Sequence, residues 1–262
     1  MQWMVDARHA ALGAAIGTMV LGLGMASAGQ AQERRTEVEA SLRYDALDSG
    51  FDDWLTQRLD VQSSRRGEPT WYGALHRERR YGTWDEALLA GAAVPLGDAW
   101  IVQPEVGRTF SADFLARWHA DLGVQHVLGG GYVGSASLRR TRYEGSQVDR
   151  LALGMERYWG NWRAAYTLNV SDVDVAGTPV GHAVALDYYY GERSLVGVRG
   201  ALGREEEGLP GGEVVTTDVA SVALHGRHWF RDDWALSWEL GALSQGDLYD
   251  RYGIQLGLRY AF

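Results

Sequence analysis

Serine and histidine are the side chains of this 262-residue chain that come nearest to a catalytic arrangement. Ser221 and His225 share one face if their segment is a strand, but residues four apart in a strand lie about 13 Å apart. That distance is too long for the hydrogen bond by which a base activates a nucleophile. The sequence contains neither a G-x-S-x-G turn nor an H-E-x-x-H helix. We therefore expect no enzyme, although a cross-strand pair of His119 or His182 with a serine leaves a lipid-modifying enzyme open.

Metal and cofactor sites are not expected either. Cysteine is absent, which excludes disulfides and thiolate ligands. The acidic run Glu205–Glu207, with Glu213 nearby, could bind divalent cations that cross-link lipopolysaccharide, or it could be a solvated run of charge. Outside the first thirty residues, the histidines do not cluster with carboxylates at ligand spacing, and they are His76, His119, His126, His182, His225 and His228.

Apolar residues recur at every second position from Arg35 onward, which predicts β-strands. Val38, Ala40, Leu42 and Tyr44 would share one face, with charged or polar residues between them. The period is the same from Trp162 to Val170, from Val180 to Tyr190, from Trp234 to Ala242 and from Tyr252 to Phe262. A soluble β-sandwich also alternates in this way, so the period alone does not decide the fold.

The connections between strands favour a single up-and-down antiparallel transmembrane β-barrel. Short turns, such as those at 160–161 and 231–233, alternate with longer polar loops, such as 141–146 and 204–213. Outer-membrane barrels have short periplasmic turns and longer outer loops. We predict about fourteen strands, with twelve as an alternative, at 35–45, 53–63, 68–79, 83–95, 98–109, 114–123, 126–140, 147–158, 161–171, 179–190, 193–204, 214–229, 232–244 and 248–262.

Composition supports a membrane barrel. The chain has 34 glycines, 11 tryptophans and 13 tyrosines, yet it lacks the apolar runs that helical membrane proteins need. Trp100, Trp159, Trp162, Trp229 and Trp234 flank short turns, where the periplasmic edge of a bilayer would lie. The net charge of −9 and the absence of a long basic run argue against a nucleic-acid partner.

Residues 1–31 have the features of an export signal. Arg8 and His9 precede an apolar run, and small residues follow it, so we expect cleavage after Ala28 or Ala31. A transmembrane anchor is the alternative, but the run is short and has no basic flank after it. The barrel would then comprise residues 32–262.

Charged residues that alternate with the apolar face are expected to line the lumen, because charge facing lipid costs roughly 2–4 kcal/mol at the midplane. Such residues could form a narrow charge-lined pore, or salt bridges that only hold the barrel rigid, and both interpretations remain open. The candidates are Glu37, Glu39, Arg43, Arg58, Arg117, His119, Arg150, Glu156, Arg163, Asp187, His225, Arg227, Glu239 and Arg259.

The last strand carries a predicted signal for the machinery that assembles outer-membrane barrels. Gln255, Gly257, Tyr260 and the terminal Phe262 give a polar residue, a glycine and two aromatics in the spacing of that signal. The last strand must close the barrel against the first, so it is presented as an exposed edge during assembly.

The chain resembles YaiO-type outer-membrane β-barrels over essentially its whole length after residue 31. The resemblance lies in the runs Arg77–Gly82, Gly160–Arg163, Tyr188–Gly191, Gly226–Leu236 and Gln245–Tyr260. It implies a monomeric barrel in the outer membrane, in contact with lipid and lipopolysaccharide, and brings no catalytic site or cofactor. It also suggests a link with polysaccharide-export components.

Overall fold

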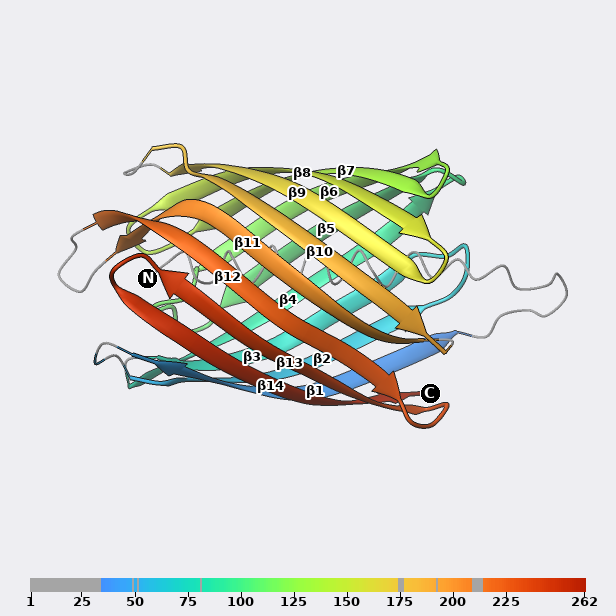
Figure 1. Ribbon diagram of the computed structural model, residues 1–262, viewed down its shortest axis with the longest axis horizontal. Helices are drawn as coiled ribbons and strands as arrows, with labels where there is room; N and C mark the ends of the chain where they lie inside the picture. Colours follow the sequence, from blue (N-terminus) through green and yellow to red (C-terminus); the bar gives the residue numbers. More distant parts are fainter. Residues whose placement is uncertain are drawn as a thin grey trace, which may run out of the picture.

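The computed structural model describes residues 34–48, 50, 52–80, 82–173, 177–191, 193–208 and 214–262. These residues form one closed antiparallel barrel of fourteen strands (Figure 1). The predicted signal peptide lies outside the described residues. The strands are β1 (Arg35–Leu47), β2 (Trp54–Ser64), β3 (Thr70–Arg80), β4 (Thr83–Leu96), β5 (Trp100–Thr109), β6 (Trp118–Gly129), β7 (Tyr132–Arg142), β8 (Gln147–Trp159), β9 (Trp162–Val173), β10 (Val180–Tyr190), β11 (Ser194–Gly208), β12 (Val214–Trp229), β13 (Trp234–Gln245) and β14 (Tyr249–Ala261).

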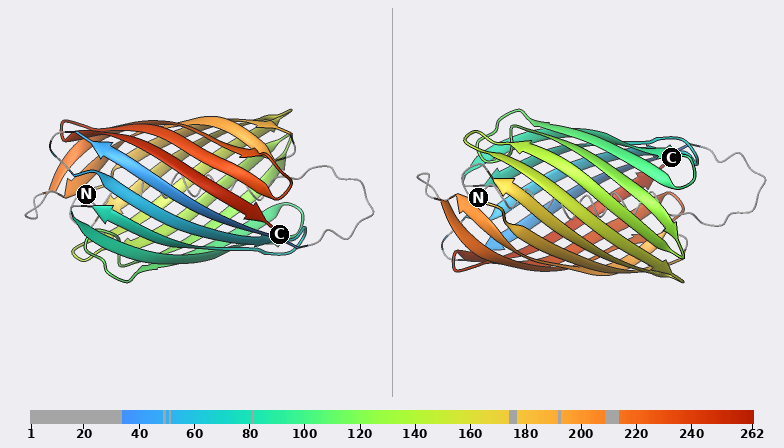
Figure 2. Two further views of the ribbon diagram at one scale, coloured as in Figure 1. Left: turned by 90° about the horizontal axis from the view of Figure 1, so that it is seen from below. Right: turned by 90° about the horizontal axis from the view of Figure 1, so that it is seen from above.

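Each strand pairs with its neighbours in the sequence, and β14 closes the barrel against β1 (Figure 2). Val38 of β1 lies opposite Tyr260 of β14, and the backbone N–H of Thr36 donates to the carbonyl oxygen of Phe262 at 2.9 Å. Closure leaves none of the described strands with an exposed edge. The predicted count of fourteen strands is confirmed.

The two ends of the barrel differ in their connections. We call the end that holds the start of β1 and the end of β14 the turn end; its connections include the two-residue turns 130–131 and 160–161. The opposite end, the loop end, holds the eight-residue connection 110–117. Among the described residues, no helix is long and apolar enough to cross a membrane.

The alternating apolar side chains point outward, away from the lumen. Leu42 of β1 and Leu256 of β14 lie opposite each other and are 51% and 53% exposed. Ser41 and Arg43, on either side of Leu42 along β1, face the interior and line its cavity. A β-sandwich would have buried these leucines between two sheets, so the alternation here serves a lipid-facing wall.

Two predicted boundaries were wrong. The turn expected at Val124-Gln125 lies instead at Gly130-Gly131, and Val124 and Gln125 belong to β6. Gly129, Gly130 and Gly131 all have positive φ, which only glycine adopts readily, so the chain reverses there. The acidic run Glu205–Glu207 belongs to the extension of β11 rather than to a loop, and Glu213 lies outside the described residues.

Aromatic side chains form an outward belt at the turn end. Trp100 stacks on His126 with ring centroids 4.0 Å apart, and Trp162 and Trp234 pack against Tyr188 and Tyr260. Amphipathic rings favour the interface between hydrocarbon and water. Trp229 points into the lumen instead. It continues the series of alternate positions on β12 that includes the inward-facing His225 and Arg227.

Candidate functional site

The barrel encloses an axial cavity of about 620 Å³. Nine carboxylates and ten arginines line it, and one of these arginines, Arg204, lies at the rim with an exposed side chain that points outward. Twelve of the fourteen candidate lumen residues are among the lining: Glu37, Glu39, Arg43, Arg58, Arg150, Glu156, Arg163, Asp187, His225, Arg227, Glu239 and Arg259.

The other two candidates behave differently. His119 points inward, and its Nε2 lies 3.1 Å from Oε1 of Glu105, which lines the cavity. Arg117, in contrast, belongs to the connection between β5 and β6. Its side chain is exposed and pairs with Glu144 of the next loop-end connection at 2.8 Å. The expected lumen position of Arg117 was wrong, because β6 begins at Trp118 and not at residue 114, so strand alternation does not apply to Arg117.

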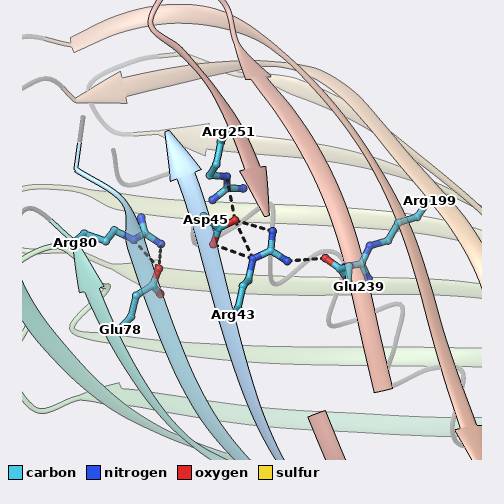
Figure 3. Close-up of polar contacts among 7 residues, drawn as sticks. All are labelled: Arg43, Asp45, Glu78, Arg80, Arg199, Glu239 and Arg251. Atoms are coloured by element: carbon cyan, nitrogen blue, oxygen red, sulfur yellow. Dashed lines mark hydrogen bonds and ion pairs between the residues drawn. The ribbon is translucent and has the colours of Figure 1, made fainter. Parts of the chain in front are cut away.

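A first group of ion pairs lies toward the loop end (Figure 3). The Arg43 guanidinium binds both oxygens of Asp45 at 2.8–3.0 Å and donates to Glu239 at 2.7 Å. Arg199 reaches the other oxygen of Glu239, and Arg251 lies 3.8 Å from Asp45. These residues come from β1, β11, β13 and β14, so the pairs tie the closing strands of the barrel together.

A second group lies toward the turn end. Arg163 of β9 donates to Glu156 of β8 at 2.8 Å and to Asp187 of β10 at 2.7 Å. The other oxygen of Asp187 lies 3.0 Å from Nε2 of His225 on β12, and Tyr158 donates to Glu156. Arg163 is only 2% exposed, so both of its partners are needed to compensate a buried charge.

Two further groups lie along the same lining. Arg259 of β14 donates to Glu37 and Glu39 of β1, and Ser237 of β13 also donates to Glu39. On the other side of the barrel, Arg139 of β7 binds Glu105 of β5 at 2.6 Å and Asp121 of β6 at 3.1 Å. All four groups join strands that are neighbours or near neighbours along the wall, so the charges are paired while the axis keeps its cavity.

Arginines stack on tryptophan at both ends of the lumen. At the loop end, Trp54 lies between Arg80 and Arg251, whose guanidinium carbons are 4.0 and 5.2 Å from the ring centroid. At the turn end, Trp229 lies between Arg193 and Arg35, at 3.8 and 5.1 Å. The faces of a tryptophan ring attract cations, and the attraction is stronger where water is excluded.

The connection between β5 and β6 folds toward the lumen at the loop end. The carboxylate of Asp85 on β4 accepts hydrogen bonds from the backbone N–H groups of residues 113, 114 and 115 at 2.7–3.0 Å. Phe114 and Leu115 are buried as a result, and the Phe114 ring lies 5.3 Å from the Arg80 guanidinium. The loop is therefore joined to the Arg80–Trp54 stack at this end.

Histidines contribute pairs that sequence reasoning missed. His76, His119 and His225 each lie 3.0–3.1 Å from one carboxylate, that of Glu78, Glu105 and Asp187 respectively. In the part of the chain that the structure describes, no three histidine, aspartate or glutamate residues are placed to hold a metal ion. Their arrangement suits ion pairing within the lumen.

Several lumen residues were absent from the sequence candidates although alternation would have placed them inside. They are Asp45, Trp54, Glu78, Arg80, Asp85, Glu105, Asp121, Arg139, Arg199 and Arg251. Their positions follow from the period of two once the strand boundaries are known.

Comparison with solved structures shows the fold. The "Anion-selective porin from Comamonas acidovorans" aligns with a TM-score of 0.52 at 14% identity, over 88% of this chain and 99% of that one. The "Acinetobacter baumannii outer membrane protein Omp33" aligns at 0.52 and 10% identity, over 89% and 100%. The "Bacterial polysaccharide outer membrane secretin" aligns at 0.54 and 8% identity, over 89% and 100%. Such low identities show only a shared architecture.

Family comparison is more specific. The family model described as "YaiO membrane beta barrel domain" matches residues 35–208, which is well over half of the chain. A search of curated proteins finds no match. The matched range begins with β1 and ends with β11, so it covers eleven of the fourteen strands of the barrel. The chain belongs to the YaiO membrane β-barrel family and is a protein of the outer membrane.

Proposed function

We propose that this barrel is a narrow pore through which small polar solutes, saccharides among them, cross the outer membrane. The observation that carries the proposal is the axial cavity of about 620 Å³ with its nearly equal numbers of carboxylates and arginines. Outer-membrane barrels have their short turns in the periplasm, so the turn end would face inward and the loop end outward.

The charge balance of the lining supports neutral polar solutes over ions. The paired groups offset one another: Arg163 with Glu156 and Asp187 leaves one negative charge. The three arginines around Asp45 and Glu239 leave one positive charge. A lumen lined by one sign of charge would instead concentrate the opposite ion. Hydroxyl-rich solutes can exchange hydrogen bonds with the paired groups and with lining serines such as Ser135 and Ser137.

Substitution at mid-height tests the proposal. Ala152 faces the cavity from β8, whereas Leu153 is the next residue and faces outward. Refolded wild type and the variants Ala152→Trp and Leu153→Trp are placed in liposomes, and swelling is measured in sugars of increasing size. We expect A152W to slow sugar entry several-fold and L153W to leave it unchanged. Equal rates for all three proteins and for empty liposomes would overturn the proposal.

A second candidate function is a structural barrel that engages an export partner in the envelope. It is favoured by the loop end, where Trp54, Arg80 and Asp85 are fully buried. Such a barrel would show no conductance in planar bilayers even after Asp85→Ala releases its loop. Affinity capture from native membranes would then be expected to recover a stable polysaccharide-export component.

We also propose that the barrel is not an enzyme. The lumen histidines lie against carboxylates in pairs that resemble the arginine pairs around them. The mass profile of lipid A from cells with and without the protein tests this. A mass difference that is lost in His225→Gln would contradict it.

A further inference from the structure

Five arginines on the outer surface of the barrel lie close to the loop end. Alternation along their strands turns Arg77 and Arg79 of β3, Arg108 of β5, and Arg140 and Arg142 of β7 away from the lumen. Leu75, Val106 and Leu138 precede them at the same parity and are 52–64% exposed. We call these five residues the arginine cluster. Arg77, Arg108 and Arg140 lie directly above these three apolar positions of the lipid-facing wall, and Arg79 and Arg142 lie two residues further toward the loop end.

The register brings the arginine cluster together. Arg77 lies opposite Glu86 on β4, and Leu88, two residues along β4, lies opposite Arg108. Trp118 of β6 lies between Arg108 and Arg142 in one row across the strands. Strands are about 4.8 Å apart, so Arg108 and Arg142 are separated by roughly 10 Å at the backbone. Flexible side chains of this length can converge on one ligand.

The arginine cluster lies about one hydrocarbon thickness from the turn end. Trp71 and Arg79 are eight residues apart on β3, as are Trp100 and Arg108 on β5. At about 3.4 Å per residue and a tilt of about 40°, eight residues rise roughly 21 Å along the axis. The apolar band of such barrels is about 25 Å tall, so the cluster lies where the second headgroup layer begins.

Partners within the protein do not neutralise the cluster. Arg77 pairs with Glu86 and Arg140 with Asp149. Arg79, Arg108 and Arg142 have no carboxylate partner in the described part of the chain. The cluster and its two carboxylates thus sum to five minus two, a charge of +3.

The β9–β14 side of the wall differs in sign near the same end. On β9–β14, the described outward charges near the loop end are Asp172, Arg204, Asp218 and Asp250, with Arg204 paired to Asp218. Their sum is one minus three, or −2. The positive charge is therefore confined to one side of the barrel, where Phe110 and Trp118 are also exposed.

We propose that the arginine cluster binds the phosphate groups of a lipopolysaccharide molecule in the outer leaflet. All 25 cationic side chains of the protein are arginines, and a guanidinium holds phosphate through two parallel hydrogen bonds. The apolar positions below the cluster would contact acyl chains, and Phe110 and Trp118 would lie at the level of the sugar. The inference requires that the loop end faces outward, but it does not require the lumen to conduct.

Lipid titration tests this inference. Refolded full-length protein in non-ionic detergent is titrated with lipid A and with the same lipid freed of its phosphates. The triple variant Arg79→Gln, Arg108→Gln and Arg142→Gln should bind lipid A roughly 100-fold more weakly, since a basic residue near an anionic headgroup layer contributes about a factor of five. The single variant Arg108→Gln should show a smaller loss in the same direction.

Arg157→Gln is the matched control. Arg157 is also exposed on the outer wall, but it lies at the turn end beside Tyr132 and Trp159. Its loss should leave lipid A affinity unchanged, and heat-modifiable gel mobility should show that all variants fold. Equal affinity for the phosphate-free lipid, an equal loss in Arg157→Gln, or displacement of lipid A by millimolar inorganic phosphate would overturn the inference. The last result would identify free phosphate as the ligand.

Discussion

The guanidinium carbon of Arg80 lies 4.0 Å from the ring centroid of Trp54, and both side chains are fully buried at the loop end of the lumen (Figure 3 shows Arg80 beside Glu78). A buried cation on a tryptophan face is worth about 2 kcal/mol or more. The stack therefore holds the Arg80 side chain in place, and Phe114 of the loop packs against it.

Removing the Asp85 carboxylate is expected to open this end. Asp85→Ala leaves three backbone N–H groups without their acceptor, each hydrogen bond to a charged group being worth about 1.5–3 kcal/mol. The loop would then leave the lumen, and the single-channel conductance in planar bilayers should rise. Asp149→Ala, which removes an exposed carboxylate on the outer wall, is the control. An unchanged conductance would show that this loop does not narrow the path.

Neutralising Arg163 should destabilise the barrel strongly. Arg163→Gln leaves Glu156 and Asp187 as buried carboxylates without their cation, a loss that typically costs about 3–5 kcal/mol. Urea unfolding in detergent measures this loss as a decrease in the free energy of unfolding. Protonation relieves uncompensated carboxylates, so the deficit should shrink at acid pH. Arg65→Gln breaks an exposed pair with Glu68 and should cost about 1 kcal/mol or less.

Glycine at the turn between β6 and β7 should resist substitution. Gly131 has a φ of +81°, and a Cβ there would collide with the carbonyl oxygen of Tyr158. Gly97 has a similar φ of +70° but open space around it. Gly97→Ala should therefore lower the free energy of unfolding only by the cost of a left-handed backbone for alanine, about 1–2 kcal/mol. Gly131→Ala should lower it clearly more, because the collision adds to that cost. Comparable unfolding midpoints for the two variants would contradict this.

The terminal aromatic is expected to matter for assembly rather than for stability. Phe262 is 66% exposed and packs 5.7 Å from Tyr260, so its removal leaves no cavity. Phe262→Ala should refold in detergent like the wild type, yet the folded barrel in outer membranes of cells should fall several-fold. Leu258→Ala, another outward residue of β14, controls for lost apolar surface. Normal membrane levels of the Phe262 variant would contradict a role of Phe262 in the assembly signal.

Local patterns were enough to predict the architecture. Alternation has a period of two along each strand, so the outward position of Leu42 and the inward position of Arg43 follow without any tertiary information. The turn at Gly160-Asn161 with its flanking tryptophans was also recognisable from a few neighbouring residues. Where the local signal was ambiguous the prediction was wrong: three glycines, not Val124 and Gln125, make the turn after β6.

Tertiary structure alone decided which charges meet. Arg43 and Glu239 are 196 residues apart and lie on β1 and β13, with β14 between them, so their ion pair depends on closure and on the stagger of three strands. The inward fold of the loop onto Asp85 and the arginine cluster on the outer wall likewise depend on cross-strand register. By itself, the sequence determined which side of the wall each strand residue faces, because that is a property of one strand. The partner of each residue is a property of the closed barrel, because neighbours across strands are set by shear and not by sequence distance.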